Sequence, residues 1–138
     1  MTTTDVVAPL LELRGLGKTF SVRDGLKTMT LHALSDVSFD VHRGEVVALV
    51  GESGSGKTTI SRCVGGLHKQ WTGELSFDGR PLGKGSRTRS AEDRKRIQYI
   101  FQNPYLSLNP RLTIQQIVSR PMALFGIAKG KAARDRVV

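Results

Sequence analysis

Apolar and polar side chains alternate along two early segments of the chain. One runs from residue 11 towards residue 22. The other is residues 37–41, in which every second residue is apolar. A strand directs successive side chains to opposite faces, so each segment is predicted to be a strand with one buried and one solvated face. The turn-forming residues 23–25 and 42–44 follow these segments and are predicted to reverse the chain.

Two further segments are apolar without this regular alternation. Residues 46–50 are apolar at every position, and residues 97–101 are largely apolar. A continuous apolar run suits a strand that is covered on both faces, as parallel strands in α/β sheets are. We therefore predict a buried strand at residues 46–50 that ends at Gly51, and a second strand at residues 97–101 that ends before Asn103-Pro104.

A helical period follows the first of these apolar runs. Four apolar residues have the spacing i, i+3, i+4 and i+7, namely Ile60, Cys63, Val64 and Leu67. This spacing predicts a helix with one apolar face packed on the sheet. Farther along the chain, Thr113 is predicted to cap another helix, which Pro121 ends or kinks.

Shorter signals predict the connections between these elements. Residues 75–77 read as a short strand that ends in Asp78-Gly79, a strong hairpin-turn signal. Ser90 and Asp93 have the spacing of a helix-start capping box, with Asp in place of the usual Glu or Gln. A short helix is therefore predicted just before residues 97–101.

A glycine-rich motif lies between the predicted strand at residues 46–50 and the predicted helix. Residues 51–58 read Gly-Glu-Ser-Gly-Ser-Gly-Lys-Thr and match G-x-x-x-x-G-K-[ST] at every specified position. A flexible Gly/Ser linker would account for the glycines, but not for the Lys-Thr pair at a strand-to-helix junction. The sequence therefore predicts a phosphate-binding P-loop.

Each residue type in the loop suits the binding of a nucleoside triphosphate. Glycines let backbone N–H groups turn towards an anion, and the N-terminus of the following helix adds the positive end of its dipole. Lys57 is predicted to reach the β- and γ-phosphates, Thr58 to offer its hydroxyl to Mg²⁺, and Thr59 to hydrogen-bond the α-phosphate. The predicted binding residues of the loop are Gly51, Ser53, Gly54, Ser55, Gly56, Lys57, Thr58 and Thr59.

Two later segments, together with the P-loop, resemble a known family. Residues 97–104 read Ile-Gln-Tyr-Ile-Phe-Gln-Asn-Pro, and residues 106–111 read Leu-Ser-Leu-Asn-Pro-Arg. With the loop, they resemble the ATPase subunits of ABC transporters, particularly those of oligopeptide, dipeptide and nickel importers, over nearly the whole chain. The resemblance implies an α/β fold: a P-loop NTPase core with an antiparallel β subdomain at the N-terminus, truncated within the helical subdomain.

The same resemblance implies how the chain is divided and which other residues act. It places a tail at residues 1–9, the β subdomain and P-loop core through the Q-loop at residues 10–104, and the start of the helical subdomain at residues 105–138. Gln102 would belong to the Q-loop, which senses Mg²⁺ and the γ-phosphate and links the nucleotide site to the membrane subunits. Phe20 occupies the place of an aromatic residue that stacks on adenine, where the family often has tyrosine.

Each of these two assignments has a simpler alternative in the residues themselves. Phe20 could fill the core together with its alternating neighbours. Gln102 could be a turn residue before Asn103-Pro104. The resemblance favours the functional interpretation, in which Thr58 and Gln102 are the predicted metal contacts.

The implied function is ATP binding and hydrolysis coupled to transport across a membrane, with ATP and Mg²⁺ as cofactors. The implied partners are transmembrane permease subunits and a second ATPase subunit, in a homodimer or heterodimer at the cytoplasmic side of the cell membrane. No direct contact with nucleic acid is expected. Two alternatives stay open: a nucleic-acid-associated ABC-type ATPase, and a nucleotide-binding remnant without catalytic activity.

Three elements of the family pattern are not found in the sequence: the Leu-Ser-Gly-Gly-Gln signature, an apolar strand closing in Asp-Glu, and a switch histidine. Residues 132–138 resemble the start of a helix within the helical subdomain. We therefore expect a fragment, a truncated gene or a remnant. We expect it to bind Mg·ATP weakly, to turn it over negligibly by itself, and to have a frayed central sheet.

Charge and composition change this interpretation little. Residues 1–79 hold 8 basic and 9 acidic residues, whereas residues 80–138 hold 13 basic and 3 acidic residues, so the net charge of +9 comes from the second part. The basic residues are scattered without interleaved aromatic residues, which favours a solvated surface over a nucleic-acid or membrane interface.

A single cysteine excludes an intrachain disulfide, and no apolar run approaches the roughly 20 residues that span a bilayer. With an acid at Asp5 in place of a basic signal region, a cytosolic, unexported chain is expected.

Overall fold

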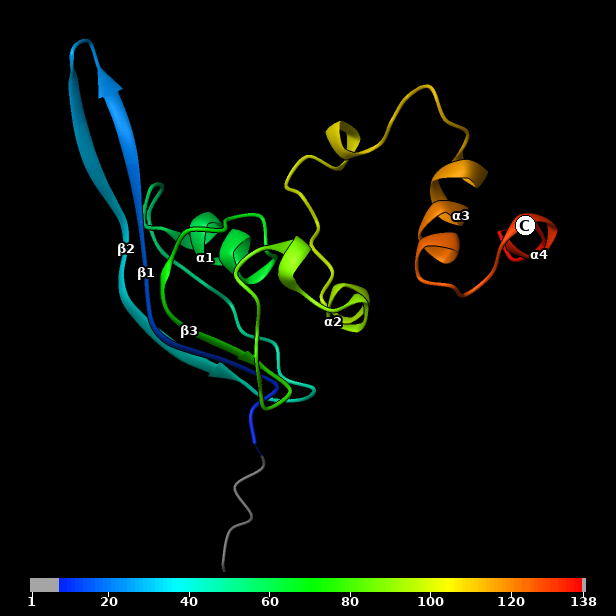
Figure 1. Ribbon diagram of the computed structural model, residues 1–138, viewed down its shortest axis with the longest axis horizontal. Coiled ribbons are helices and arrows are strands. Elements are labelled where there is room, and N and C mark those ends of the chain that lie inside the picture. Colours follow the sequence, from blue (N-terminus) through cyan, green and yellow to red (C-terminus); the bar gives the residue numbers. More distant parts are fainter. Residues whose placement is uncertain (1–7, 138) are drawn as a thin grey trace, which may run out of the picture. The chain divides into compact units, whose positions relative to one another are not determined.

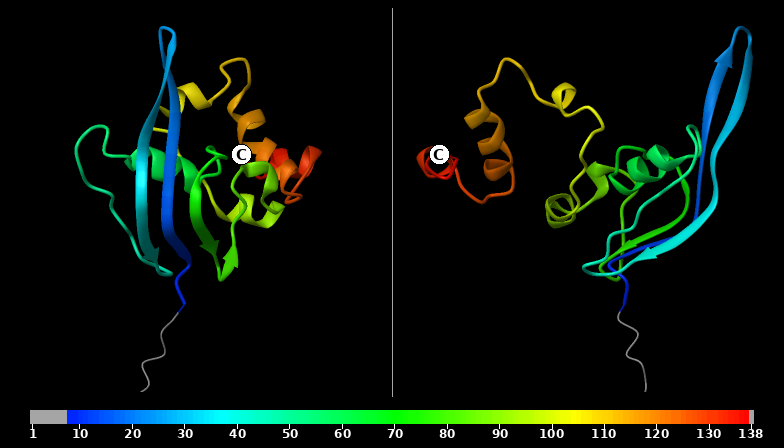
Figure 2. Two further views of the ribbon diagram at one scale, coloured as in Figure 1. Left: turned by 60° about the vertical axis from the view of Figure 1, so that its left-hand side comes forward. Right: turned by 180° about the vertical axis from the view of Figure 1, so that it is seen from behind.

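An antiparallel sheet is the main element of the first part of the molecule. The computed structural model describes residues 8–137, and the chain separates into two compact units, Met1–Ser90 and Ala91–Val138. In the first unit the described strands have the order β2-β1-β3-β4. Their bounds are β1 Leu11–Asp24, β2 Lys27–Val41, β3 Thr72–Phe77 and β4 Arg80–Pro81. Strands β1 and β2 form a long hairpin, and β3 pairs with the other edge of β1 (Figures 1 and 2). The predicted antiparallel β subdomain is therefore confirmed.

Strand β1 changes its buried face part-way along its length. Leu13 and Leu16 are both 0% exposed, although a regular strand would direct them to opposite faces. The pairing of β1 with β2 shifts register between these two residues and again on both sides of Lys18. The first shift adds a residue to β1 and turns the following side chains of β1 to the other face, whereas the two shifts beside Lys18 add residues to β2. As a result, Lys18 is only 7% exposed, with the neighbouring Leu16 also buried.

The short strands and their turn follow the sequence signals. Residues 75–77 lie in β3, and Asp78 and Gly79 link it to β4 with φ angles of +54° and +71°. A two-residue hairpin turn with positive φ at both positions matches the right-handed twist of the strands, and Asp-Gly favours it. The hairpin predicted at these residues is confirmed.

Helix α1, Lys57–Val64, packs its apolar side against the first unit's core. Ile60 is 8% exposed and Cys63 is 0% exposed, as the helical spacing predicted. The prediction was wrong for Leu67, which lies beyond the helix and is 43% exposed. The reason is Gly66, whose φ of +73° ends the helical backbone three residues after Cys63.

The strands predicted at residues 46–50 and 97–101 are absent from the structure of these segments. No strand is present at residues 46–50 or residues 97–101 within the described chain. Val46 and Val50 are 94% and 92% exposed, and Ile100 is 88% exposed. A strand needs a hydrogen-bonded neighbour, and among the described strands none pairs with either segment. The prediction of strands at these positions is therefore wrong for this structure.

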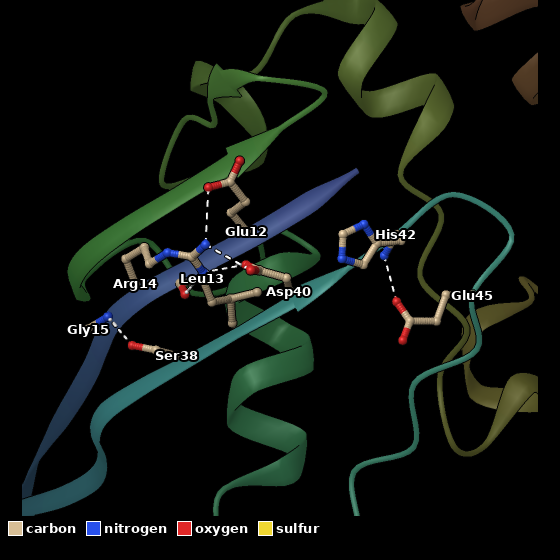
Figure 3. A network of polar contacts seen from close by, with 8 residues as sticks. All are labelled: Glu12, Leu13, Arg14, Gly15, Ser38, Asp40, His42 and Glu45. Atoms are coloured by element: carbon tan, nitrogen blue, oxygen red, sulfur yellow. Dashed lines mark hydrogen bonds and ion pairs between the residues drawn. The ribbon is translucent and has the colours of Figure 1, made fainter. Parts of the chain in front are cut away.

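An ion-pair network joins β1 to β2 near the start of the hairpin (Figure 3). The Arg14 guanidinium makes two hydrogen bonds to the Asp40 carboxylate, one of them 2.9 Å from Nη2 to Oδ2, and lies 3.4 Å from Glu12 Oε2. The Arg14 hydrogen bond lowers the pKa of Asp40, and the same bond raises the pKa of Arg14. Nearby, the Gly15 N–H donates to Ser38 Oγ at 2.9 Å. These contacts tie the strands together where β1 bulges.

The second unit contains α2 Ala91–Arg96, the 3₁₀ turn η2 Pro104–Ser107, α3 Ile114–Leu124 and α4 Gly130–Asp135; a further turn, η1 Ser86–Thr88, belongs to the first unit. The short helix predicted after Ser90 is α2. Thr113 caps α3 as predicted, because its Oγ1 accepts from the Gln116 N–H at 3.2 Å while Gln116 Oε1 accepts from the Thr113 N–H at 2.9 Å. Pro121 does not end α3, because the Phe125 N–H still donates to the Pro121 carbonyl at 2.9 Å.

Candidate functional site

The glycine-rich loop leads directly into the N-terminus of α1. Gly56 is the N-cap residue, no side chain caps this end of the helix, and no acidic residue lies in its first turn. The first backbone N–H groups of a helix have no partner inside the helix, and the helix dipole makes this end partly positive. An uncapped start without acids therefore leaves donors for an anion at the point where the motif predicts phosphate binding.

Lys57 folds back over the loop that precedes it. Its Nζ donates to the carbonyl oxygens of Gly51 at 2.8 Å and Glu52 at 2.6 Å, and to Ser55 Oγ at 3.0 Å. The Ser55 N–H also donates to the Glu52 carbonyl, at 3.2 Å. The ammonium group thus lies inside the turn of the loop, where phosphate oxygens would be stronger acceptors than neutral carbonyls.

Gly56 fixes the loop against strand β2. Its φ of +93° is accessible to glycine and strained for other residues, and an added Cβ would lie 2.7 Å from Leu34 Cδ2 and 2.9 Å from the Ala33 carbonyl oxygen. No other residue fits this contact without displacing β2. The motif's glycine at position 56 therefore serves both the backbone turn and the close approach of the loop to the sheet.

The remaining predicted loop residues lie around the same turn. Gly51, Ser53, Gly54 and Thr58 are exposed, and Thr59 is half-buried in the first turn of α1. In the described part of the chain, no three His, Cys, Asp or Glu side chains gather as metal ligands. The exposed Thr58 hydroxyl is a hard oxygen donor, which suits Mg²⁺, and Mg²⁺ commonly takes most of its other ligands from phosphates and water.

Phe20 lies in β1 beside a pocket of the first unit. The half-buried ring makes an edge-to-face contact with the His68 ring, with centroids 5.3 Å apart, and the Lys18 Nζ lies 4.5 Å from its centroid. The pocket has a volume of about 720 Å³ and is lined by Phe20, Lys18, Trp71, Gln70 and His32 among others. Burial, followed by the charges of Lys18 and Arg62, lowers the pKa of His68, which favours the neutral ring. Phe20 is therefore neither fully in the core nor free on the surface.

Arg89 supports the opposite end of α1 and was missed by sequence reasoning. It is 6% exposed, and its guanidinium donates to the carbonyls of Val64 at 2.6 Å, Cys63 at 3.1 Å and Gly83 at 2.9 Å. A cation at a helix C-terminus satisfies the last carbonyls and interacts favourably with the dipole. In the sequence this arginine is one of several in a basic loop, and nothing there separates it from its exposed neighbours.

Gln102 belongs to the second unit. It is exposed and lies in a bend before η2, where the Asn103 side chain accepts from the Tyr105 N–H at 3.2 Å. The loop residues and Phe20 lie in the first unit. The role of Gln102 as a metal and γ-phosphate sensor stays a prediction.

Comparison with known proteins identifies the family. The ABC transporter family model matches residues 34–137, which include the P-loop, α1 and Gln102. This chain belongs to the ABC transporter family. The match covers well over half of the chain, and the resemblance seen in residues 51–58, 97–104 and 106–111 is thereby confirmed.

Curated relatives of this ABC protein carry importer names. A protein of Brucella ovis named as a peptide import ATP-binding protein is 48% identical over 119 residues, covering 86% of this chain and 36% of the relative. A Brucella abortus protein with the same description matches equally well. The glutathione import ATP-binding protein GsiA of Salmonella paratyphi A is 41% identical over 132 residues, covering 94% of this chain and 21% of the relative. The chain thus spans about a third or less of the length of these relatives. Among residues 8–137, no helix has both the length and the apolar character required to cross a bilayer.

Proposed function

We propose that this chain binds Mg·ATP as the nucleotide-binding part of an ATPase subunit of an ABC importer that transports peptides or peptide-like compounds. The observation that carries the proposal is the uncapped N-terminus of α1 with the Lys57 ammonium folded into the loop before it. The importer names of the Brucella and Salmonella relatives support the subfamily and the class of transported compound.

The loop residues have distinct roles in this proposal. The backbone N–H groups of residues 51–58 surround the phosphates, and Lys57 exchanges its carbonyl partners in the loop for β- and γ-phosphate oxygens. Thr58 supplies a hydroxyl oxygen to the magnesium ion, and Thr59 bonds the α-phosphate. Bound magnesium offsets the negative charge of the phosphates. Phe20 stacks on the adenine, and Gln102 reports the occupied site to the membrane subunits.

The proposed partners follow from the importer function. Transmembrane permease subunits receive the conformational change, and a second ATPase subunit completes the nucleotide sites at the cytoplasmic face of the membrane. The protein that contains this chain would hydrolyse ATP, which requires groups that position water and stabilise the developing charge on the phosphate. Recovery of defined permease subunits with the tagged full chain from detergent-solubilised membranes tests the partners, and recovery of ribosomes or nucleic acid instead would contradict them.

Calorimetric titration of the full chain with Mg·ATP tests the binding site itself. Unaltered chain should bind, Lys57→Ala should lose binding by roughly a hundredfold or more because a desolvated ion pair with phosphate is lost, and Lys27→Ala should bind normally. Lys27 is a matched control because it is an exposed lysine of β2 outside the loop. Absence of heat with folded, unaltered chain, or equal binding by Lys57→Ala, would contradict the proposal.

A further inference from the structure

Lys18 is a cation with little exposed surface and no anionic partner. Its residue surface is 7% exposed, and within residues 8–137 its ammonium group makes no ion pair and no hydrogen bond. The ammonium group keeps contact with solvent, because no buried side-chain nitrogen or oxygen of the described residues lacks a hydrogen-bond partner, and Lys18 lines the pocket beside Phe20.

The Lys18 ammonium group lies over the face of the Phe20 ring. Lys18 Nζ lies 4.5 Å from the ring centroid, within the distance at which a cation is attracted by the negative face of an aromatic ring. The two residues are at i and i+2 of β1 and share one side of the strand, because the extra residue at the register shift between Lys18 and Thr19 lies in β2. The register shift that buries Lys18 thus also places its charge over Phe20.

A second side chain holds the ring from another element. The His68 ring meets Phe20 edge to face, with an interplanar angle of 71°, and His68 follows α1 in the chain. Lys18 and His68 together limit how the Phe20 ring can rotate. The ring still lines the pocket of about 720 Å³, whose size lies within the roughly 300–1,000 Å³ of small-molecule sites.

We propose that Lys18 is a positioning residue for purine recognition: it covers one face of Phe20 and so holds the ring with its remaining surface towards the bound base. This inference rests on the proposed binding of Mg·ATP, and it adds a residue to which neither the P-loop motif nor the family resemblance assigned a role. Lys18 acts through Phe20, and the phosphates are held by the loop residues independently of it.

The test separates base recognition from phosphate recognition. The full chain is titrated with Mg·ATP and, separately, with magnesium tripolyphosphate, which carries the phosphates without a base. Lys18→Met keeps a long apolar side chain and removes the charge, and it should weaken ATP binding by roughly tenfold while leaving tripolyphosphate binding unchanged. Lys18→Arg, which keeps a cation able to cover the ring, should restore most of the affinity for ATP. Lys27→Met serves as the control for loss of an exposed lysine.

A double-mutant cycle tests whether Lys18 acts on ATP binding through the Phe20 ring. In a Phe20→Leu background, which has no ring to hold, Lys18→Met should cause no further loss of ATP affinity. Lys18→Gln, whose tip is polar and uncharged, replaces Lys18→Met in each titration if the latter does not fold, as judged by far-UV circular dichroism. Equal weakening of ATP and tripolyphosphate, or an undiminished effect of Lys18→Met in the Phe20→Leu background, would overturn the proposal. If the unaltered chain binds neither ligand, the proposed function itself fails, which is a distinct result.

Discussion

Two segments of the first unit with apolar residues differ in burial: one lies in the core and the other is exposed to solvent. In β1, Leu13 and Leu16 are each 0% exposed, whereas Val46 and Val50, which precede the P-loop, are 94% and 92% exposed. Hydrophobicity therefore does not decide which segment is buried. β1 is paired on both edges, by β2 and β3, and none of the described strands pairs with residues 46–50.

The distance along the chain to the partner explains the difference. Strand β2 begins only three residues after β1 ends, so the hairpin turn brings the partner into place at little cost in loop entropy. A parallel strand has no such neighbour and needs a connection of a dozen or more residues. The apolar run at residues 46–50 has the composition of a parallel strand, and composition alone provides no hydrogen-bonding neighbour.

Hydrogen exchange should show the largest difference between the two segments. In the full chain, the amides of Leu13 and Leu16 should exchange at least about a hundredfold more slowly than those of residues 46–50, because only the former lie in a paired strand. Exchange detected by mass spectrometry after rapid proteolysis measures both in one sample. Equal protection of the two segments would mean that residues 46–50 do have a partner in solution.

Truncation of single side chains should sharpen the same comparison. Leu13→Ala should lower the free energy of unfolding by about 2–5 kcal/mol, because it leaves a cavity in the core. Val50→Ala should change it by less than about 0.5 kcal/mol, because the side chain is exposed. Urea titrations followed by circular dichroism give these values, with Leu26→Ala as the control since Leu26 is a fully exposed leucine at the hairpin turn. A loss at Val50 similar to that at Leu13 would disprove the distinction.

The distance along the chain between partner segments also determines how much of the fold could be predicted from the sequence. Local signals were sufficient for the hairpin strands, the Asp78-Gly79 turn, α1 and the Thr113 cap, because each depends on residues close together in the chain. The strands expected at residues 46–50 and 97–101 depend on partners that periodicity cannot supply. The register shifts between β1 and β2 were also missed, since an alternating pattern does not reveal where an extra residue enters a strand.

Substitutions at Arg89 test whether the well-packed region of the first unit extends to the end of α1. Arg89→Ala should lower the free energy of unfolding by about 2–3 kcal/mol, because three carbonyl oxygens lose a charged donor at a buried site. Arg87→Ala, in the same basic loop but exposed, should have almost no effect. Arg89→Lys should be intermediate, since an ammonium group keeps the charge but cannot reproduce the guanidinium's hydrogen bonds. Similar losses for Arg87→Ala and Arg89→Ala in thermal or urea unfolding would show that general charge matters and the buried contacts do not.

The residues of the candidate site could likewise be predicted from the sequence only in part. The motif located the loop residues, because the glycines and Lys57-Thr58 at fixed spacing within a few residues predict a phosphate-binding turn before a helix. Lys18, His68 and Arg89 carry no such signal, since their partners are residues brought near by the sheet and by the end of α1. Strand β1 also contains Glu12 and Arg14, so the presence of a charged residue at position 18 did not distinguish Lys18 from its neighbours.

The smallest expected effect concerns His68, which lies where β1 meets the segment after α1. Burial is the main cause that lowers its pKa in the folded chain below the reference value of 6.5, so the unfolded chain binds more protons once the pH falls below that value. The contribution of neutral His68 to stability is therefore complete above the unfolded pKa, and it is lost progressively as the pH falls through this value towards the lowered folded pKa. Urea midpoints at pH 7.5 and pH 5.5 should consequently drop less for His68→Gln than for the unaltered chain.

His32→Gln provides the matched control, because His32 is exposed and is not among the groups that shift the pKa of Asp40. Its drop in midpoint between the two pH values should equal that of the unaltered chain, since both keep His68, and Asp40, whose pKa is lowered from 3.8, stays ionised at both pH values. The difference between the variants then isolates His68 from the general effect of acid. An unchanged drop for His68→Gln would show that the ring is hydrated in solution, and that the packed region of the first unit ends before residue 68.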